Sequence, residues 1–560
     1  MAKDRVFSFD VFDTCLARLC GEPRLLFDVL SLKVQKAMGE DCNEHLRELF
    51  VVARIESSGC NLEEIYENVA KRFPLPDSIQ QMVQLELDTE REMLVPIKAT
   101  KSLVEELRQK GRILFISDMY LPSSFIREQL VKHGFFKEGD SLYVSDELQA
   151  WKYDGSLYKL VHDQENITYR QWHHYGDNRH SDYCIPRKLG IHAHHLHYDY
   201  LHYEEIWRER GAFQYQYPSI LAGICRAVRL SHGMIDWQNG FVCDISAPLM
   251  VTWVLRILND ASRRGIKKLF FCARDVHSEY LIARRFSASF PEIEIKYLFI
   301  SGPSLYESEN RLDYFRSVGL ASEIPTAIVD SCTSGKTLSI LNELFRVNGI
   351  PNVRGYFFVH MPIQNMEISY SDNTLVTYEN VSNYLENVGK KKVKRISGMR
   401  IFYELLFSLN FHKKTMAYKY HGERIRPEFA VDKEDDWCFV GDSSRLVKKN
   451  NDTLLLGIAN AMMVAGMTDY CNEIFENIAQ QTLADFISYP RKEYLEYLNH
   501  YYWNGKPFVE KQYCKNKGVW KRGCLYYTMP NFIAELLRSL SYRPYLRRQL
   551  NNLVDRIKHG

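Results

Sequence analysis

The chain has 560 residues, of which 46% are hydrophobic and 25% charged, and a formal net charge of +2. This length predicts roughly two to four domains of a soluble globular protein. Because there is no overall basic field, we expect no nucleic-acid partner. The 13 cysteines include no CxxC pair, the N-terminus lacks an apolar signal core and no run of about 18 apolar residues occurs. We therefore expect a cytoplasmic protein.

The first third of the chain has an α/β pattern. An apolar run at 6–9 predicts a strand, and long helical patterns fill 16–100. Further strands are predicted at 111–118, 141–147 and 170–178, each ending in polar residues. Strands that alternate with helices indicate a parallel sheet. In such sheets ligands bind beyond the carboxyl ends of the strands.

The polar residues that follow these strands suit phosphoryl transfer. Asp10 lies in FDVFDT, Ser117 in FISD, Lys152 after SDELQAW, and Asp177 and Asp182 in GDNRHSD. A carboxylate can attack phosphorus, a serine hydroxyl can hold a phosphoryl oxygen and a lysine can offset the charge. An acidic pair can hold Mg²⁺, a hard cation that prefers oxygen ligands.

These motifs, in this order, resemble the haloacid-dehalogenase (HAD) superfamily, chiefly its phosphatases. The resemblance covers residues 5–196 and implies that Asp10 is the nucleophile, with Ser117 and Lys152 as further catalytic residues. It also implies that the helical insertion at 16–100 is a cap. The implied cofactor is Mg²⁺, at a metal site made by Asp10, Phe12, Asp177 and Asp182.

The acid that follows the nucleophile in these phosphatases is absent. Its position is occupied by Phe12, and Asp13 stands where the family usually has glycine. Alternate residues of an extended backbone face the same way, so on such a backbone Asp13 would point away from the missing acid's place. We therefore expect either that another group supplies the proton or that turnover is slow.

A second α/β series follows, with strands predicted at 267–275, 295–301, 326–332 and 353–360. We expect two domains, 1–205 and 206–560. The second consists of an α/β core at about 215–380 and a mainly helical part at about 396–560. The expected fold class is α/β: a HAD-like Rossmannoid domain with a helical cap, then a second α/β domain.

The stretch TAIVDSCTSGKTLSILNEL (326–344) predicts a strand, a polar loop and a helix. Backbone N–H groups at the start of a helix form an anion site. A P-loop would need glycine at position 330, where Asp330 stands. The stretch also resembles the loop of type I phosphoribosyltransferases, and a plain turn is the remaining interpretation. The phosphoribosyltransferase resemblance implies that Asp330 is a catalytic residue that holds the ribose hydroxyls. It also implies a substrate site made by Ser331, Thr333, Ser334, Gly335, Lys336 and Thr337.

Another strand end, FFCARDVHSEYL (270–281), places Arg274 beside Asp275. Arginine is a natural bidentate partner for a diphosphate. We therefore assign Arg274 to catalysis and Asp275 to substrate binding, and an ordinary surface ion pair is an equal alternative.

Together the two halves resemble the dual-domain ribofuranosyltransferases of bacterial surface-polysaccharide assembly. The resemblance implies transfer of 5-phosphoribose from phosphoribosyl diphosphate to a glycan, in this case a lipid-linked one, followed by removal of the 5-phosphate in the HAD-like part. One alternative is a HAD-type sugar-phosphate phosphatase with a non-catalytic binding half. The other is a P-loop-like kinase fused to a phosphatase.

Two stretches have weaker signals. Alternation in HAHHLHYDYLH (192–202) places His192 and His194 on one face, but a strand end and linker is favoured over a metal site. The basic stretch at 533–560 suits contact with an anionic inner membrane face. A helix packed on the protein body is the favoured alternative.

Overall fold

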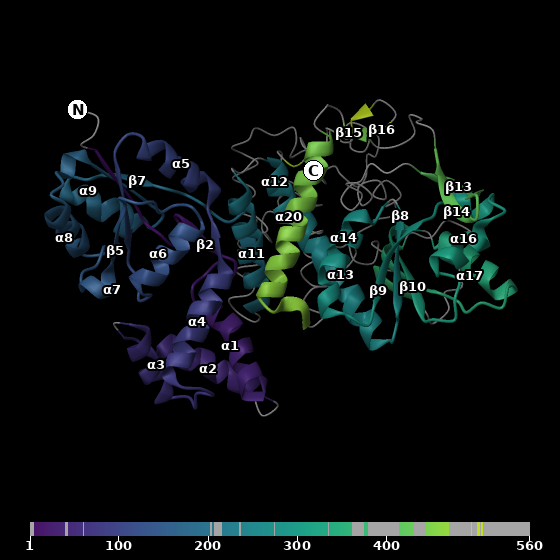
Figure 1. Ribbon diagram of the computed structural model, residues 1–560, viewed down its shortest axis with the longest axis horizontal. Helices are drawn as coiled ribbons and strands as arrows, with labels where there is room; N and C mark the ends of the chain where they lie inside the picture. The colour runs from purple at the N-terminus through teal and green to yellow at the C-terminus, as the bar shows by residue number, and fades with distance from the viewer. Residues whose placement is uncertain are drawn as a thin grey trace, which may run out of the picture. The chain divides into compact units, whose positions relative to one another are not determined.

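The computed structural model describes residues 5–39, 43–59, 61–201, 204–205, 216–233, 237–273, 275–333, 335–360, 374–378, 414–430, 438–439, 444–469, 494, 501–503 and 506–507. The chain divides into two compact units (Figure 1). The first consists of Met1–Asp236 with Asn460–Met467, and the second of Trp237–Ala459 with Thr468–Gly560. Each unit contains a five-stranded parallel sheet, which confirms the α/β class.

The sheet of the first unit has the strand order β5-β4-β1-β6-β7. Its strands are β1 (Val6–Phe9), β4 (Arg112–Ser117), β5 (Ser141–Val144), β6 (Trp172–Gly176) and β7 (His192–His195). The surrounding helices are α5 (Lys98–Arg108), α6 (Ser123–Lys132), α7 (Ser145–Leu148), α8 (Ser156–Glu165) and α9 (Ile185–Leu189), with short turns η2 (Tyr169–Gln171) and η3 (Arg179–Cys184). The chain starts in β1, builds one side, then returns to build the other. The order therefore reverses between β1 and β6, which is where such sheets bind ligands.

Four helices form an insertion between two short antiparallel strands, β2 (Leu16–Arg18) and β3 (Leu94–Pro96). They lie together at the lower end of the first unit in Figure 1 and are α1 (Leu25–Met38), α2 (Glu44–Glu56), α3 (Leu62–Ala70) and α4 (Ile79–Met93). Side chains fix three of the helix starts, because Asn43, Asn61 and Ser78 each accept a hydrogen bond from the first turn. This insertion occupies the range in which a cap was expected.

Helix α11 (Gln216–His232) also belongs to the first unit, where it packs against α1, α5, β2 and β3. The approach is close at Gly223: a Cβ there would lie 2.2 Å from the backbone carbon of Cys20. Gly21 beside it has φ +81°, a conformation that favours glycine. The first unit thus continues past the expected boundary at 205/206.

The sheet of the second unit has the order β12-β11-β10-β8-β9. Its strands are β8 (Lys268–Ala273), β9 (Glu294–Phe299), β10 (Thr326–Thr333), β11 (Arg354–His360) and β12 (Thr374–Tyr378). Its helices include α12 (Trp237–Phe241), α14 (His277–Phe286), α15 (Gly302–Tyr306), α16 (Arg311–Val318) and α17 (Lys336–Val347), with turns η4 (Val242–Ser246) and η5 (Ser287–Ser289). Here the order reverses between β8 and β10, so these two strands mark the expected ligand crevice.

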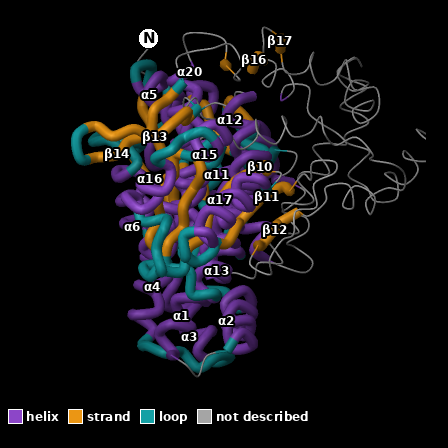
Figure 2. The backbone as a smooth tube through the Cα atoms, turned by 90° about the vertical axis from the view of Figure 1, so that its right-hand side faces the viewer, coloured by secondary structure: helices purple, strands orange, loops and turns teal. Residues whose placement is uncertain are grey.

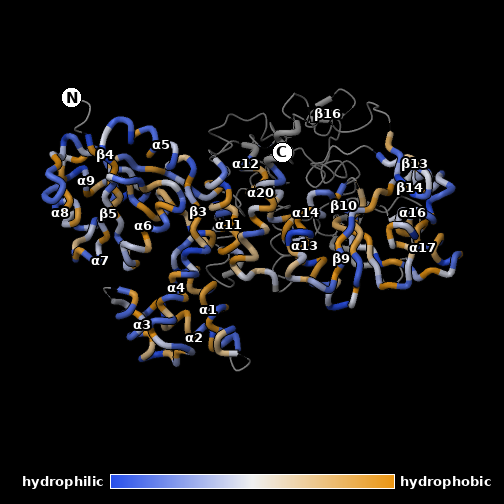
Figure 3. Tube along the Cα trace, in the orientation of Figure 1, coloured by the Kyte–Doolittle hydropathy of each residue, from blue (hydrophilic) through white to orange (hydrophobic). Residues whose placement is uncertain are grey.

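Helix α13 (Ala247–Arg263) forms much of the core of the second unit. The helical stretch Asn239–Arg263 is long and apolar enough to cross a membrane, but 94% of its most apolar window is buried inside the protein. Figure 3 shows the hydrophobic residues along it. Burial on this scale is typical of a core helix.

The described part of 396–560 contains strands as well as a helix. Strands β13 (Thr415–His421) and β14 (Arg424–Phe429) form an antiparallel hairpin, visible in Figure 2. A small sheet contains β15 (Cys438–Phe439), β16 (Tyr501–Trp503) and β17 (Lys506–Pro507), and the helical elements are α20 (Ser444–Val464) and η7 (Met467–Asp469). The basic stretch at 533–560 lies outside the described residues.

Candidate active site

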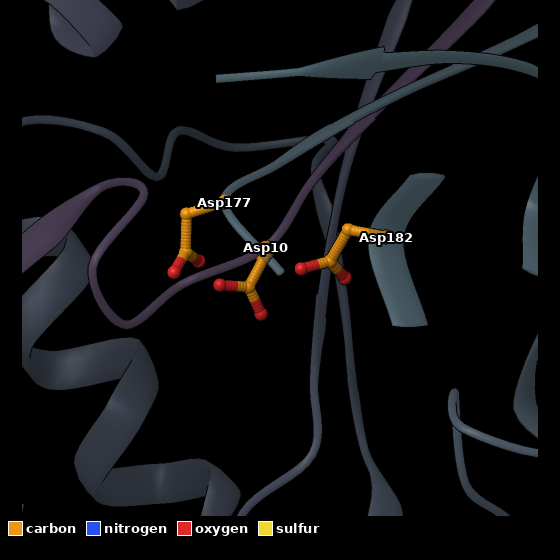
Figure 4. Close-up of side chains that lie close together, drawn as sticks. All are labelled: Asp10, Asp177 and Asp182. Carbon is orange, nitrogen blue, oxygen red and sulfur yellow. The ribbon is translucent and has the colours of Figure 1, made fainter. Parts of the chain in front are cut away.

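Three carboxylates gather at the carboxyl end of the first sheet. Asp10 follows β1, Asp177 follows β6 and Asp182 lies in η3. One oxygen from each lies within 4.8 Å of the other two, and Figure 4 shows Asp10 between its two neighbours. Within the part of the chain that the structure describes, these three carboxylates are the one group of acidic, histidine or cysteine side chains that could hold a metal ion. The reversal of strand order places all three there.

Lys152 joins two of these carboxylates. Its ammonium donates to Asp10 Oδ1 at 2.5 Å and to Asp182 Oδ1 at 2.6 Å, and the side chain is 3% exposed. The backbone N–H of Lys152 donates to the carboxylate of Asp118 at 2.9 Å, which holds the loop in place. Asp118, the last residue of FISD, thus has a positioning contact that its place in the motif does not predict. Ser117, the residue before it, is buried at the end of β4 on the same sheet edge.

A chain of buried hydrogen bonds runs from Trp172 to the carboxylate of Asp182. Trp172 Nε1 donates to Ser8 Oγ at 2.7 Å, and Ser8 Oγ lies 2.7 Å from His174 Nδ1. If the hydroxyl donates to Nδ1, Nε2 carries the ring proton and donates to Asp182 at 3.2 Å. Burial lowers the pKa of His174, which agrees with this neutral form. The chain fixes the carboxylate through groups with no net charge.

The charges of the cluster are tightly balanced. Burial raises the pKa of Asp10 well above its usual value; Lys152 opposes this, and Asp182 and Asp177 add to it. Burial also acts to raise the pKa of Asp182, but Lys152 and His174 outweigh it and hold that pKa low. Burial, with Asp13 and Asp182, raises the pKa of Asp177 to about 6. Asp10 and Asp177 therefore hold their protons more tightly than ordinary carboxyl groups do.

The residues present fit a magnesium ion. The cluster offers only carboxylate oxygens, which are ligands for a hard cation rather than for zinc or copper. Thr14 fixes Asp177, because its hydroxyl donates to Asp177 Oδ1 at 3.1 Å and accepts from the Asp177 N–H. Gly176 allows the close packing, since a Cβ there would lie 2.5 Å from Asp182 Cβ. Phe12, also predicted at the metal site, is half-buried two residues after Asp10.

The assumption of an extended backbone is wrong at Asp13. Its φ is +57°, in the left-handed region, and its N–H donates to Leu16 O in a tight turn. The carboxylate is close enough to Asp177 to raise the pKa of that residue. Alternation therefore does not apply at Asp13, which belongs to the surroundings of the site.

Arg226 of α11 pairs with Asp13. Its Nη1 lies 3.0 Å from Asp13 Oδ1, its Nε donates to Tyr198 O at 2.8 Å, and the side chain is buried. No motif in the sequence marks this arginine, because it lies in an apolar helix more than 200 positions from its partner. A helix beyond the expected first domain thus contacts the turn that follows the nucleophile.

Phe12 lies against a buried ion pair. The Arg18 guanidinium is 4.4 Å from the centre of the Phe12 ring and makes a bidentate contact with Glu90 of α4, its shortest bond being 2.8 Å. A second pair, Arg54 and Glu86, lies within the insertion, and Glu86 also accepts hydrogen bonds from Tyr66 and Tyr120. The position of the missing acid is thus next to structural charges that are already paired.

The second predicted site lies partly outside the described residues. Arg274 and Ser334 are not described, and for Thr333 only the strand β10 is. Asp330 is half-buried on β10 and accepts the Ser331 N–H at 2.9 Å. Gly335, with φ +78°, directly precedes α17. Within the first turn of this helix, Lys336 is exposed and Thr337 is half-buried. The predicted order of strand, loop and helix is confirmed. Asp275 is half-buried after β8, close enough to act with Asp330 on the thiol of Cys272, whose pKa is raised first by burial.

The histidines of β6 and β7 stack on one face, as alternation predicts. The rings of His173 and His192 lie 4.9 Å apart, and His173 Nδ1 is 3.2 Å from His194 Nε2. Burial, with its two neighbours, lowers the pKa of His173 to about 4, so this ring is neutral at neutral pH. A cavity of about 600 Å³ opens beside it, where His195 Nε2 lies 2.6 Å from the carbonyl of Asp177.

No protein-family model matches this chain, and a comparison with curated proteins finds no match. Among solved structures, the magnesium-bound HAD-hydrolase YfnB from Bacillus subtilis is 14% identical with a TM-score of 0.25, and the match covers 34% of this chain and 86% of that one. A 2-haloacid dehalogenase from Pseudomonas syringae is 16% identical with a TM-score of 0.26, covering 34% and 84%. A HAD family enzyme from Bacteroides thetaiotaomicron is 14% identical with a TM-score of 0.25, covering 35% and 94%. These are similarities of fold over about a third of this chain.

Proposed function

We propose that the first unit is a magnesium-dependent phosphomonoesterase that works through an aspartyl-phosphate on Asp10. The observation that carries this proposal is the position of Lys152, whose ammonium bridges Asp10 and Asp182 inside a carboxylate cluster. A lysine so placed leaves one Asp10 oxygen for attack and supplies positive charge where phosphate oxygens gather.

In the first step an oxygen of Asp10 attacks the phosphorus of a phosphomonoester, and the bond from phosphorus to the sugar oxygen breaks. The leaving oxygen takes up a proton from solvent water. Asp10, Asp177 and Asp182 would hold Mg²⁺, which when bound offsets the charge of the phosphoryl group and of the carboxylates. The buried hydroxyl of Ser117 lies on the same edge and is our candidate for holding a phosphoryl oxygen.

In the second step water attacks the phosphorus of the aspartyl-phosphate, the bond to Asp10 breaks and inorganic phosphate leaves. A general base normally assists this attack. With Phe12 at the usual position, Asp13 is our candidate, since its turn is next to Asp177. Its carboxylate is held by an ion pair with Arg226, whose Nη1 lies 3.0 Å away. We expect slow hydrolysis of the intermediate.

We further propose that the phosphomonoester is the 5-phosphate of a ribosyl group that the second unit has placed on a glycan. Two features support this: Asp330 is half-buried near the carboxyl end of β10, and α17 begins directly after the loop that follows this strand, beside the reversal of strand order. The donor would be phosphoribosyl diphosphate and the acceptor a lipid-linked glycan in the cytoplasm. Membrane contact through 533–560 is part of this proposal.

The test is a matched pair of full-length variants, Asp10→Asn and Asp330→Ala, given phosphoribosyl diphosphate, Mg²⁺ and a panel of glycans. Mass spectrometry should show a gain of one pentose with the native protein and of one phosphopentose with Asp10→Asn. Asp330→Ala should transfer nothing and still release phosphate from a synthetic phosphoribosyl glycan.

Each contrary result removes a different part of the proposal. Unchanged phosphate release by Asp10→Asn would refute the nucleophile. Phosphatase activity without transfer or donor binding would favour a phosphatase with a binding half, and a requirement for ATP would favour the kinase fusion.

A further inference from the structure

The cavity of about 600 Å³ in the first unit has no role in the proposed phosphatase mechanism. Two segments form it: the outer side of η3, and the end of β7 with the chain that follows. The described residues that line it are Arg179, Tyr183, Ala193, His194, His195 and His197. None of these belongs to the proposed catalytic or metal-binding set, so the cavity is a separate feature of the fold.

Asp177 lies between the cavity and the carboxylate cluster. His195 Nε2 is 2.6 Å from the backbone carbonyl oxygen of Asp177. A carbonyl oxygen only accepts, so Nε2 carries the ring proton and donates. The side chain of the same residue belongs to the cluster with Asp10 and Asp182, as Figure 4 shows. The wall of the cavity and the cluster thus contact the backbone and the side chain of one residue.

Arg179 gives the cavity a positive charge. Its side chain is exposed, and within the described part of the chain its guanidinium makes no hydrogen bond or ion pair. The described residues that line the cavity include no acid. A guanidinium offers only donors, in a planar fork that matches a phosphate or a carboxylate. The charge of the cavity therefore favours an anionic ligand.

Tyr183 adds a further donor and an aromatic surface. Its hydroxyl accepts a hydrogen bond from Arg187 Nη1 at 2.5 Å, which leaves the hydroxyl proton to donate to a ligand. The ring centres of His195 and His197 lie 3.8 Å apart, and those of Tyr183 and His195 lie 5.9 Å apart. Aromatic faces suit the apolar face of a sugar ring. The cavity thus combines anion-binding donors with surfaces for a ring.

We propose that this cavity binds a sugar phosphate, as a ligand distinct from the phosphomonoester cleaved at Asp10. Arg179 and the Tyr183 hydroxyl bind its phosphate, and His195 and His197 pack against its ring. The volume is in the range of small-molecule sites and exceeds what phosphate alone would fill. The inference requires neither the transferase nor the phosphatase activity, because it concerns binding alone.

The test is a calorimetric titration of the full-length Asp10→Asn protein with ribose 5-phosphate in the presence of a chelator. Neither hydrolysis nor Mg²⁺ then contributes, and one binding site is expected. Adding Arg179→Gln should weaken binding at least ~10-fold, since a charge-assisted contact is lost. Adding Ala193→Leu, which narrows the cavity and keeps its charge, should also weaken binding. Arg170→Gln, an exposed arginine of the same unit, is the matched control and should change nothing.

A parent Asp10→Asn protein that does not bind ribose 5-phosphate would overturn the proposal. So would unchanged binding after Arg179→Gln and after Ala193→Leu in proteins that keep the parent's thermal transition, since the ligand would then be held elsewhere.

Two further probes separate the parts of the ligand. Ribose, which lacks the phosphate, should not bind, and inorganic phosphate should bind more weakly than ribose 5-phosphate. Equal affinity for the last two would refute the contact with the rings. Failure of the native protein to release phosphate from any phosphomonoester would refute the proposed phosphatase and leave this binding site standing.

Discussion

The two parallel sheets differ in how the charge of their buried acidic residues is balanced. Each places acidic residues where its strand order reverses: beside β1 and β6 in the first unit, and beside β8 and β10 in the second. In the first unit Lys152 holds two carboxylates within 2.6 Å of its ammonium. In the second unit Glu279 is buried without a partner among the described residues. An internal cation therefore offsets the charge of the first cluster, whereas Asp275 and Asp452, the charged groups that act on Glu279 among the described residues, are both acids.

The Lys152→Met variant should have the largest effect on activity and stability, because it removes the cation that pairs with Asp10 and Asp182 and leaves these buried carboxyl groups without it. Phosphate release should fall at least ~10³-fold, as when a group that acts as part of a catalytic unit is removed. In a chelator the protein should lose about 3–5 kcal/mol of stability, the usual cost of breaking a buried ion pair. Thermal unfolding with and without Mg²⁺ checks this, and an unchanged transition in the chelator would contradict it.

The Arg226→Gln variant removes the ion pair between α11 and Asp13, the residue beside the first site. Losing the pair with Asp13 should lower kcat about 10-fold, a cost of about 1.4 kcal/mol typical of a charge-assisted hydrogen bond. KM should change little. The readout is steady-state phosphate release, with Arg170→Gln, an exposed arginine of the same unit, as the control. If both variants behave alike, Arg226 does not position Asp13.

Replacing Glu279 with methionine should have the opposite sign to Lys152→Met. Removing an unpaired buried carboxyl group in a chelator should raise stability by about 1 kcal/mol, because nothing is left unpaired in its place. Chemical denaturation at neutral pH measures the difference. A loss of stability would show that Glu279 has a structural partner.

The smallest expected effect is a pH dependence of folding stability that comes from Asp28 of α1. Burial raises its pKa from 3.8 to about 7, while Arg47 and Arg24 oppose the rise. Since the folded protein holds this proton more tightly than the unfolded chain, stability should fall as the pH rises from about 4 to about 7. The slope should be a fraction of the ~1.4 kcal/mol per pH unit of a fully shifted group. Asp28→Asn should flatten it in denaturation curves measured across this range.

Apolar runs and the polar residues after them are local features, so they predict β1, β4, β5 and β6 of the first sheet and β8 to β11 of the second, with the residues at their carboxyl ends. They do not predict β12. Asp10, Lys152, Asp177 and Asp182 were found in this way, and the structure brings all four together. Arg226 and Glu279 could not be found, since their importance depends on what packs against them. Asp13 was misjudged because a non-glycine residue at φ +57° leaves no local pattern.

The Arg18–Glu90 pair also limits how the insertion of α1 to α4 can move. It ties β2 to the end of α4, just before β3, so it closes the two chain segments that lead into the insertion. Opening this stem would strand two buried charges at a cost of several kcal/mol. A motion of the insertion that leaves this pair intact therefore keeps β2 and β3 together.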